Sequence, residues 1–75
     1  MRSYSLDVAE AIWGGDKSRL GVRLGQACLE RRLPVVQVAE ALGVTRQTIY
    51  NWFTGAYDPT ESHREAVERF LASLD

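Results

Sequence analysis

Residues 35–55 have the sequence VVQVAEALGVTRQTIYNWFTG, and this stretch decides the fold. Its first part places apolar residues three, four and seven positions apart, which is the spacing of one helical face. Pro34 precedes that part, at a position where a helix start tolerates proline because the missing N–H would be unpaired there anyway. Its second part repeats the helical spacing with Ile49, Trp52 and Phe53. The stretch therefore predicts two short helices, over residues 35–42 and 46–53, joined by a three-residue turn.

The turn and the two helices also carry residues that suit a close helical crossing. Gly43 stands where a left-handed backbone is expected after a helix. Val44 is apolar within a turn, which makes sense if it plugs a core beneath it. Thr45 is a good cap for the second helix, and Ala39 is small where two helices must cross closely. Together these features predict a helix-turn-helix motif over residues 35–55.

Helical spacing recurs in three further segments, over residues 5–13, 17–33 and 60–74. We expect Ser5 to cap the first of them and either Asp16 or Ser18 to cap the second. No stretch alternates apolar and polar residues over five or more positions, so strands are not expected. The predicted fold class is all-α, a compact domain of five helices. The expected inward residues outside the motif include Leu6, Ala9, Ile12, Trp13, Leu20, Leu24, Ala27, Cys28, Ala66, Val67, Phe70, Leu71 and Leu74.

Gly21 and Gly25 lie one turn apart inside the predicted helix 17–33, where each glycine costs about 1 kcal/mol relative to alanine. Two interpretations are open: the helix tolerates these glycines without a packing reason, or a neighbouring helix, such as the one over residues 5–13, comes close at that point. The sequence favours neither interpretation.

The chain has 75 residues, which is enough for one small core. We expect a single domain over 1–75, with an N-terminal extension helix in 1–16 and a core in 17–75. The single Cys28 excludes an intramolecular disulfide, and the first residues do not resemble a signal peptide. No apolar run approaches the roughly 18 residues of a membrane span. A cytoplasmic protein, in a bacterial or phage-infected cell, with no membrane partner is expected.

The outward face of the second motif helix carries groups that recognise nucleic-acid bases. With Ile49 facing inward, Gln47, Tyr50, Asn51 and Thr54 face outward, and Arg46 lies on the flank of the first turn. Arginine bonds guanine bidentately, and asparagine or glutamine bonds adenine. The face has no carboxylate, whereas a merely solvated helix would more often carry Glu and Lys.

At these residues the chain resembles the phage repressor and Cro type of helix-turn-helix, the lambda-repressor-like or XRE class. The resemblance covers about residues 20–74 and is strongest over 39–45, at Ile49 and over 52–55. It implies a five-helix domain that reads bases with Arg46, Gln47, Tyr50 and Asn51. Many members begin the motif with a phosphate-binding glutamine, but this chain has Val35 there. The phosphate contacts expected here are Gln37, Thr45, Thr54, Tyr57, Arg31 and Arg32.

The formal net charge is −1, which by itself argues against a nucleic-acid partner. The charge is unevenly distributed, however. Residues 17–46 hold six basic and two acidic residues, whereas residues 1–16 hold one against three and residues 47–75 hold two against five. Because phosphate attraction requires a positive face and not a positive protein, the basic segment before the second motif helix is the expected docking region.

Other chemistry is not indicated. Cys28 and His63 stand alone, so no metal site is expected, and we expect Cys28 in the core and His63 exposed. No nucleophile constellation or phosphate loop is present, so neither an enzyme, nor a cofactor, nor a small-molecule ligand is expected. The residues after Trp52 and Phe53 lack the basic run of a homeodomain.

The favoured function is a sequence-specific DNA-binding transcriptional regulator of the repressor or Cro type. It would occupy an operator on double-stranded DNA as a homodimer, with half-sites about 34 Å apart. Its dimer surface would be either residues 5–13 or residues 70–74. The alternatives are a module that binds a partner protein, as an anti-repressor or inhibitor does, and a DNA-binding accessory factor in phage recombination or packaging.

Overall fold

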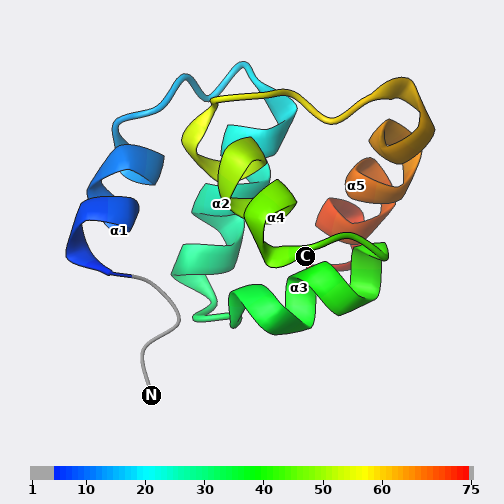
Figure 1. Cartoon of the computed structure of the whole chain (residues 1–75), viewed down its shortest axis with the longest axis horizontal. Coiled ribbons are helices and arrows are strands. Elements are labelled where there is room, and N and C mark those ends of the chain that lie inside the picture. The colour runs from blue at the N-terminus through cyan, green and yellow to red at the C-terminus, as the bar shows by residue number, and fades with distance from the viewer. Residues whose placement is uncertain (1–4, 75) are drawn as a thin grey trace.

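The computed structural model describes residues 5–74, which form five α-helices and no strand (Figure 1). The all-α, five-helix fold predicted from the sequence is therefore confirmed. Residues 1–4 of the predicted N-terminal extension 1–16, and residue 75, lie outside the described residues. The helices are α1 (Leu6–Trp13), α2 (Leu20–Glu30), α3 (Val35–Leu42), α4 (Arg46–Thr54) and α5 (Glu61–Ser73).

The helices α3 and α4 begin at the predicted residues because local signals fix their ends. Pro34 is the N-cap of α3, and the Thr45 hydroxyl accepts a hydrogen bond of 3.2 Å from the N–H of Thr48 at the start of α4. Gly43 ends α3 in the left-handed conformation, with φ 69°, and the next N–H, of Val44, donates to the Ala39 carbonyl at 3.0 Å. The second helix ends one residue later than predicted.

The helix α2 is shorter at both ends than the predicted 17–33. Neither Asp16 nor Ser18 caps it, because the Asp16 carboxylate accepts hydrogen bonds from the N–H and the hydroxyl of Ser18 within the preceding loop. These bonds lower the pKa of the Asp16 carboxyl. Arg19 is the N-cap instead, without a side-chain cap bond. At the other end Arg32 adopts φ 54°, which an α-helix cannot continue.

The expected inward face of α1 is wrong in part. Ile12 is fully buried, but Leu6 is 72% exposed and Trp13 is 48% exposed. The contact of α1 with the rest of the protein is narrow and is centred on Ile12, with Val8 one turn earlier. Because successive residues are about 100° apart around a helix, Trp13 is turned away from that contact.

The helix α2 crosses the centre of the molecule, with α1 and α5 on opposite sides and α4 in front of it (Figure 1). Its two glycines lie at the crossing with α4. A Cβ atom at Gly21 would lie 2.6 Å from the Trp52 carbonyl oxygen, and one at Gly25 would lie 2.9 Å from Cγ of Phe53 and 3.1 Å from Cγ2 of Ile12. Close packing is therefore the reason for both glycines, and α4 is the main partner, with α1 contributing at Gly25.

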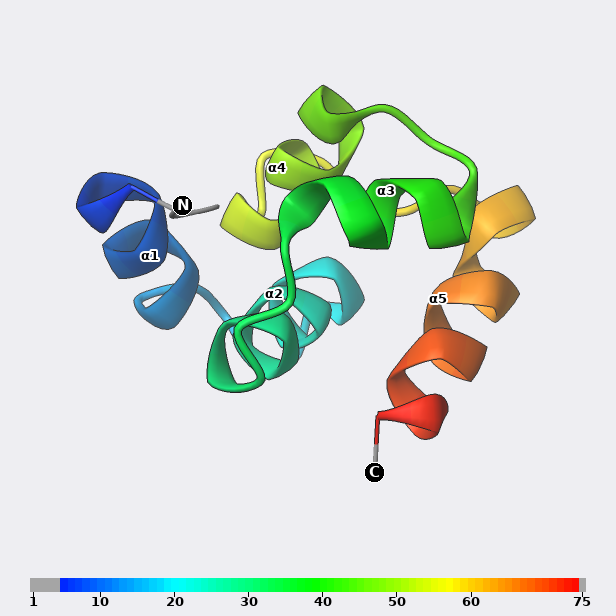
Figure 2. The same cartoon turned by 90° about the horizontal axis from the view of Figure 1, so that it is seen from below.

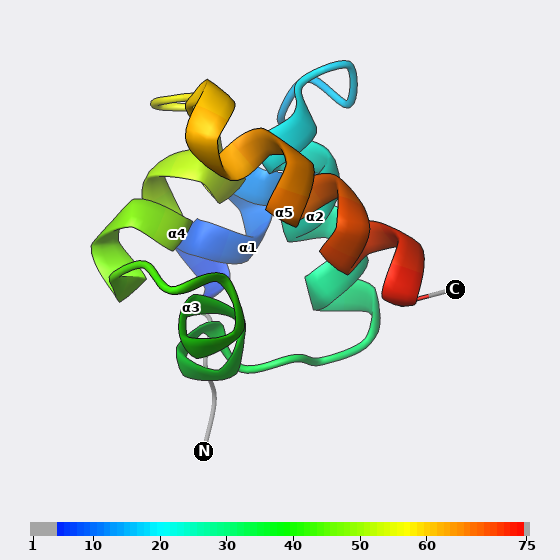
Figure 3. The ribbon, with the colours of Figure 1, turned by 90° about the vertical axis from the view of Figure 1, so that its right-hand side faces the viewer.

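A single cluster of ten buried side chains forms the core, and the motif helices supply six of them. Cys28 is fully buried as expected, and burial raises the pKa of its thiol to about 12. The predicted stripe of α5, the helix nearest the viewer in Figure 3, is also found inward, with Val67 fully buried. None of the helices in residues 5–74 is long and apolar enough to cross a membrane. The buried cluster is Ile12, Leu24, Cys28, Val35, Val38, Ala39, Ile49, Trp52, Phe53 and Val67.

Candidate nucleic-acid interface

The helix α4 lies on the outside of the molecule, next to α3 and over α2 (Figures 1 and 2). Its inward side anchors it firmly, since Ile49 and Phe53 are fully buried and Trp52 is 4% exposed. Its sequence, RQTIYNWFT, contains no carboxylate. The helix therefore presents a rigidly held face of amides, hydroxyls, one guanidinium and one phenol.

The predicted base contacts Gln47 and Asn51 form a pair on this face. The Gln47 side-chain amide donates to the Asn51 side-chain carbonyl at 3.1 Å, which is the distance of an ordinary hydrogen bond. Each amide group offers an acceptor oxygen and donor N–H groups. After one bond between them, the pair still presents an acceptor on one residue and a donor on the other.

The remaining predicted base contacts lie one turn apart on the same helix. Arg46 is exposed in the first turn of α4, and its guanidinium has no hydrogen-bond or ion-pair partner among residues 5–74. Tyr50 is half-buried and packs in part against the core. All four predicted base-contacting residues thus lie on one helix, but they differ in solvent exposure. Arg46 and Gln47 are exposed, whereas Tyr50 and Asn51 are half-buried.

The predicted phosphate contacts at the two ends of α4 are less uniform. Thr45 is exposed, and its hydroxyl caps the helix and lies 3.0 Å from the Thr48 hydroxyl. The Thr54 hydroxyl donates to the Tyr50 carbonyl at 2.8 Å, which directs its proton into the helix and away from an incoming phosphate. Tyr57 is 67% exposed, so it does not cover the core, and its backbone N–H is bonded to the Asn51 carbonyl.

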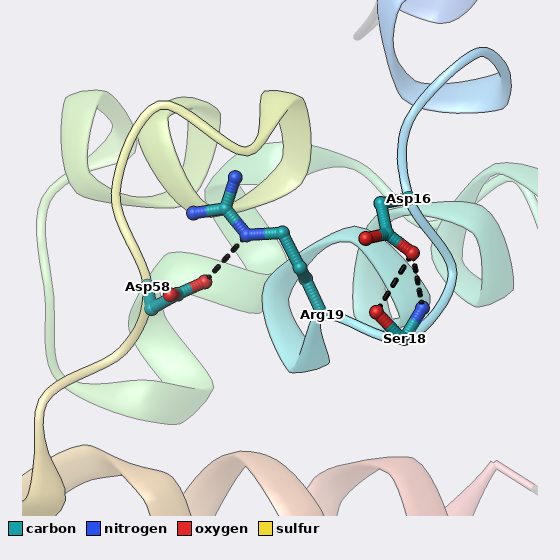
Figure 4. A network of polar contacts seen from close by, with 4 residues as sticks. All are labelled: Asp16, Ser18, Arg19 and Asp58. Atoms are coloured by element: carbon teal, nitrogen blue, oxygen red, sulfur yellow. Dashed lines mark hydrogen bonds and ion pairs between the residues drawn. The ribbon is translucent and has the colours of Figure 1, made fainter.

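The loop after α4 is held by Arg19, a residue that sequence reasoning did not single out. The Arg19 guanidinium reaches from the start of α2 to Asp58, with Nε 2.9 Å from Oδ1 (Figure 4). Its Nη1 atom also lies 3.1 Å from where a Cβ would stand on Gly55, the left-handed residue that ends α4. The two residues are 39 positions apart, so no local sequence pattern predicts their contact.

The other predicted phosphate contacts come from α3 and from the end of α2. Gln37 is exposed in the first turn of α3, while Val35 is buried and faces the core. The Arg31 guanidinium donates to the carbonyls of Leu74 and Ala27, at 3.0 and 3.3 Å, and so ties the end of α2 to the end of α5. Arg32 is exposed. A phosphate role for Arg31 is therefore less favoured by the geometry than one for Gln37 or Arg32.

The basic segment 17–46 does not form one continuous patch beside α4. Arg19 and Arg23 lie at the start of α2, whereas Arg31 and Arg32 follow its last residue, about 16 Å away along the helix axis. These four arginines, which we expected to belong to one docking region, therefore lie at two separate places, one at each end of α2. Of these arginines, Arg19 lies beside the loop that follows α4.

His63 is half-buried rather than exposed as we expected. Its ring centre lies 5.7 Å from that of Trp52, and the two rings are tilted by 55°. This contact joins the first turn of α5 to the buried side of α4. His63 therefore supports the position of the motif and is not part of its outward face.

Comparison with known families agrees with this geometry. The family model described as a helix-turn-helix domain matches residues 19–75, which leaves α1 outside the match. No curated protein and no solved structure matches the chain. Since the match covers most of the chain and includes both motif helices, this protein belongs to the helix-turn-helix domain family.

Proposed function

We propose that this protein is a sequence-specific DNA-binding transcriptional regulator of the repressor or Cro type. In this proposal α4 enters the major groove of an operator in the cytoplasm of a bacterial or phage-infected cell. The observation that carries the proposal is the carboxylate-free outward face of α4, on a helix whose opposite side is buried. In this proposal the protein occupies the operator and so blocks access to it.

The hydrogen-bonded amide pair on α4 supports a particular base preference. Adenine presents an acceptor, N7, and a donor, the N6 amino group, in the major groove. The pair of Gln47 and Asn51 presents a donor and an acceptor after its internal bond. Since the two patterns are complementary, we expect each half-site to contain an adenine read jointly by these residues, with Arg46 free to bond a neighbouring guanine.

Selection from random duplex DNA, followed by gel-shift titration of the enriched sequence, tests the proposal. Gln47→Ala and Asn51→Ala should each make the free energy of binding to that sequence less favourable by about 1–3 kcal/mol and relax the preference at one base position. Because the two side chains bond to each other, the double variant should lose less than the two losses combined.

Two control variants separate base readout from contacts that do not depend on sequence. Gln37→Ala should weaken binding to all sequences alike, because it removes a phosphate contact, and Arg69→Ala, on α5, should change little. If both amide variants bind the selected sequence as the wild type does, the base-contact assignment is wrong. If no sequence is enriched and no shift occurs at low salt, the DNA-binding proposal fails and the protein-partner alternative takes its place.

A homodimer is also part of the proposal, because one such module contacts few base pairs. Of the two surfaces considered, the one on α1 has exposed large apolar side chains. Leu6 and Trp13 are exposed and lie seven positions apart, on one side of α1. At the other surface, Phe70 and Leu74 pack against the core. We therefore place the dimer contact on Leu6 and Trp13, against the same residues of a second copy.

Analytical ultracentrifugation tests the dimer surface. The wild type should sediment as a dimer at micromolar concentration, and Leu6→Glu should sediment as a monomer with an unchanged circular-dichroism spectrum. The same variant should still bind one half-site but lose cooperative binding to two. Ser73→Glu, which changes the charge on α5, is the matched control. A Leu6→Glu protein that remains dimeric would exclude this surface.

A further inference from the structure

A polar cavity of about 280 Å³ lies between the start of α2 and the first half of α5, beside the loop that follows α4. None of the predicted base-contacting residues lines it. The charged side chains around it are Arg19, Arg23, Asp58, Arg64 and Glu68. It is therefore a separate, arginine-rich feature on the edge of the domain.

The cations of this cavity are only partly matched by its anions. Three guanidinium groups and two carboxylates line the cavity, and within residues 5–74 only Arg19 of these arginines has an ion-pair partner, through its bond to Asp58. The guanidinium groups of Arg23 and Arg64 have no hydrogen-bond or ion-pair partner in the described part of the chain. Like charges held together in this way favour an anion that can satisfy them.

We propose that this cavity binds a phosphate group through Arg19, Arg23 and Arg64. Guanidinium groups donate in a planar fork that matches the oxygens of phosphate, and such charge-assisted bonds are stronger than neutral ones. The volume of about 280 Å³ is just below the roughly 300–1,000 Å³ of ligand pockets, which suits one small anionic group. Either a backbone phosphate of bound DNA or a small phosphorylated molecule would supply this chemistry.

Asp58 competes with a phosphate group for Arg19. Its carboxylate already occupies the Nε–H of Arg19, and a phosphate that takes the Arg19 fork displaces it. Asp58 belongs to the loop between Gly55 and α5, which also carries the exposed Tyr57. Binding in the cavity therefore acts on the loop next to the DNA-reading helix. The site departs from our sequence-based expectation that the chain has no small-molecule ligand, and it does not rest on the proposed DNA-binding function.

The test is titration of the ¹⁵N-labelled full chain with inorganic pyrophosphate at constant ionic strength, without DNA. The side-chain Nε–H signals of Arg19, Arg23 and Arg64 should shift together with one saturating curve. Arg64→Ala and Arg23→Ala should each weaken binding about tenfold or more, as expected for loss of a hydrogen bond to a charged group. Asp58→Asn should tighten binding, because it removes the competing carboxylate.

Arg69→Ala is the matched control, since it removes one exposed arginine from the same helix as Arg64 but outside the cavity. It should leave pyrophosphate binding within twofold of the wild type. The proposal is overturned if no saturation is reached, if Arg69→Ala weakens binding as much as Arg64→Ala, or if Asp58→Asn weakens it. All the replaced residues are exposed, so the variants should fold as the wild type does, and circular dichroism checks this.

A second arm separates the two sources of phosphate. If DNA supplies the group, pyrophosphate should displace bound duplex, and Arg64→Ala should weaken binding to a long duplex more than to one trimmed around the half-site. If a small molecule supplies it, pyrophosphate should saturate the cavity while the affinity for duplex is unchanged. Both results support a phosphate site, and saturation without any DNA binding would refute only the DNA-binding proposal.

Discussion

Replacement of Gly21 by alanine should loosen the contact that holds the DNA-reading helix. The added Cβ would lie 2.6 Å from the Trp52 carbonyl oxygen and 2.9 Å from the Trp52 Cβ. Because both are rigid parts of α4, no rotamer change can relieve the overlap, and α2 and α4 must separate. Overpacking of this kind costs about 1–3 kcal/mol, and the better helix propensity of alanine offsets about 1 kcal/mol of it.

Since the overlap is with backbone, the cost should lie in the upper part of that range, about 2–3 kcal/mol, so the net loss of unfolding free energy is about 1–2 kcal/mol. Each kcal/mol lowers the Tm by about 4–8 °C in a domain of this size. Urea unfolding followed by tryptophan fluorescence and by circular dichroism measures it, with coincident transitions as the check for two-state behaviour. Operator affinity should fall as well, since the Trp52 carbonyl accepts the N–H of Gly55 at the end of α4. A Gly21→Ala protein as stable as the wild type would refute the close crossing of α2 and α4.

Three further outcomes follow from the structure. Gly43→Ala should cost about 1–2 kcal/mol in urea unfolding although its Cβ meets nothing within 4 Å, because φ is +69° there, and Gly43→Asn should cost less; equal losses would contradict this origin. The thiol of Cys28 ionises near pH 8.5 in the unfolded chain, whereas burial raises its pKa to about 12 in the folded protein. The free energy of unfolding should therefore fall above pH 8.5, by up to about 1.4 kcal/mol per pH unit. Cys28→Ala should lack this slope in the same unfolding assay. The dependence of DNA affinity on salt should be shallow, since few basic residues flank α4, and a log–log slope near −8 to −10 in a salt titration would show many more phosphate contacts.

The motif could be predicted almost residue by residue because its signals are local. Pro34, Gly43 and Thr45 each act on the backbone beside them, through a missing N–H, a left-handed φ and a cap bond. The same local reasoning failed at α2, where Asp16 and Ser18 bond to each other in the loop and leave the helix uncapped. A capping residue type therefore predicts a helix start only when no nearer partner takes its side chain.

The features that surround the motif depend on contacts between distant residues and could not be predicted. Arg19 bonds to Asp58 across 39 positions, and the exposed Arg31 bonds to the carbonyl of Leu74. The periodicity of α1 was visible, but the breadth of its contact was not, so Leu6 was expected inside. Base-contacting residues could be assigned to α4 from its sequence, whereas the bond between Gln47 and Asn51 depends on side-chain rotamers.

The buried amide of Gln26 has a consequence for the limits of the domain. It donates to the Ile12 carbonyl at 3.1 Å, and Ile12 itself closes the core over Gly25. A fragment trimmed to the matched residues 19–75 would lose both, so the Gln26 amide would exchange its internal bond for water and the apolar side chains beside Gly25 would be exposed. We therefore expect the cooperative folding unit of this protein to be larger than the matched region and to include α1, which closes one side of the core.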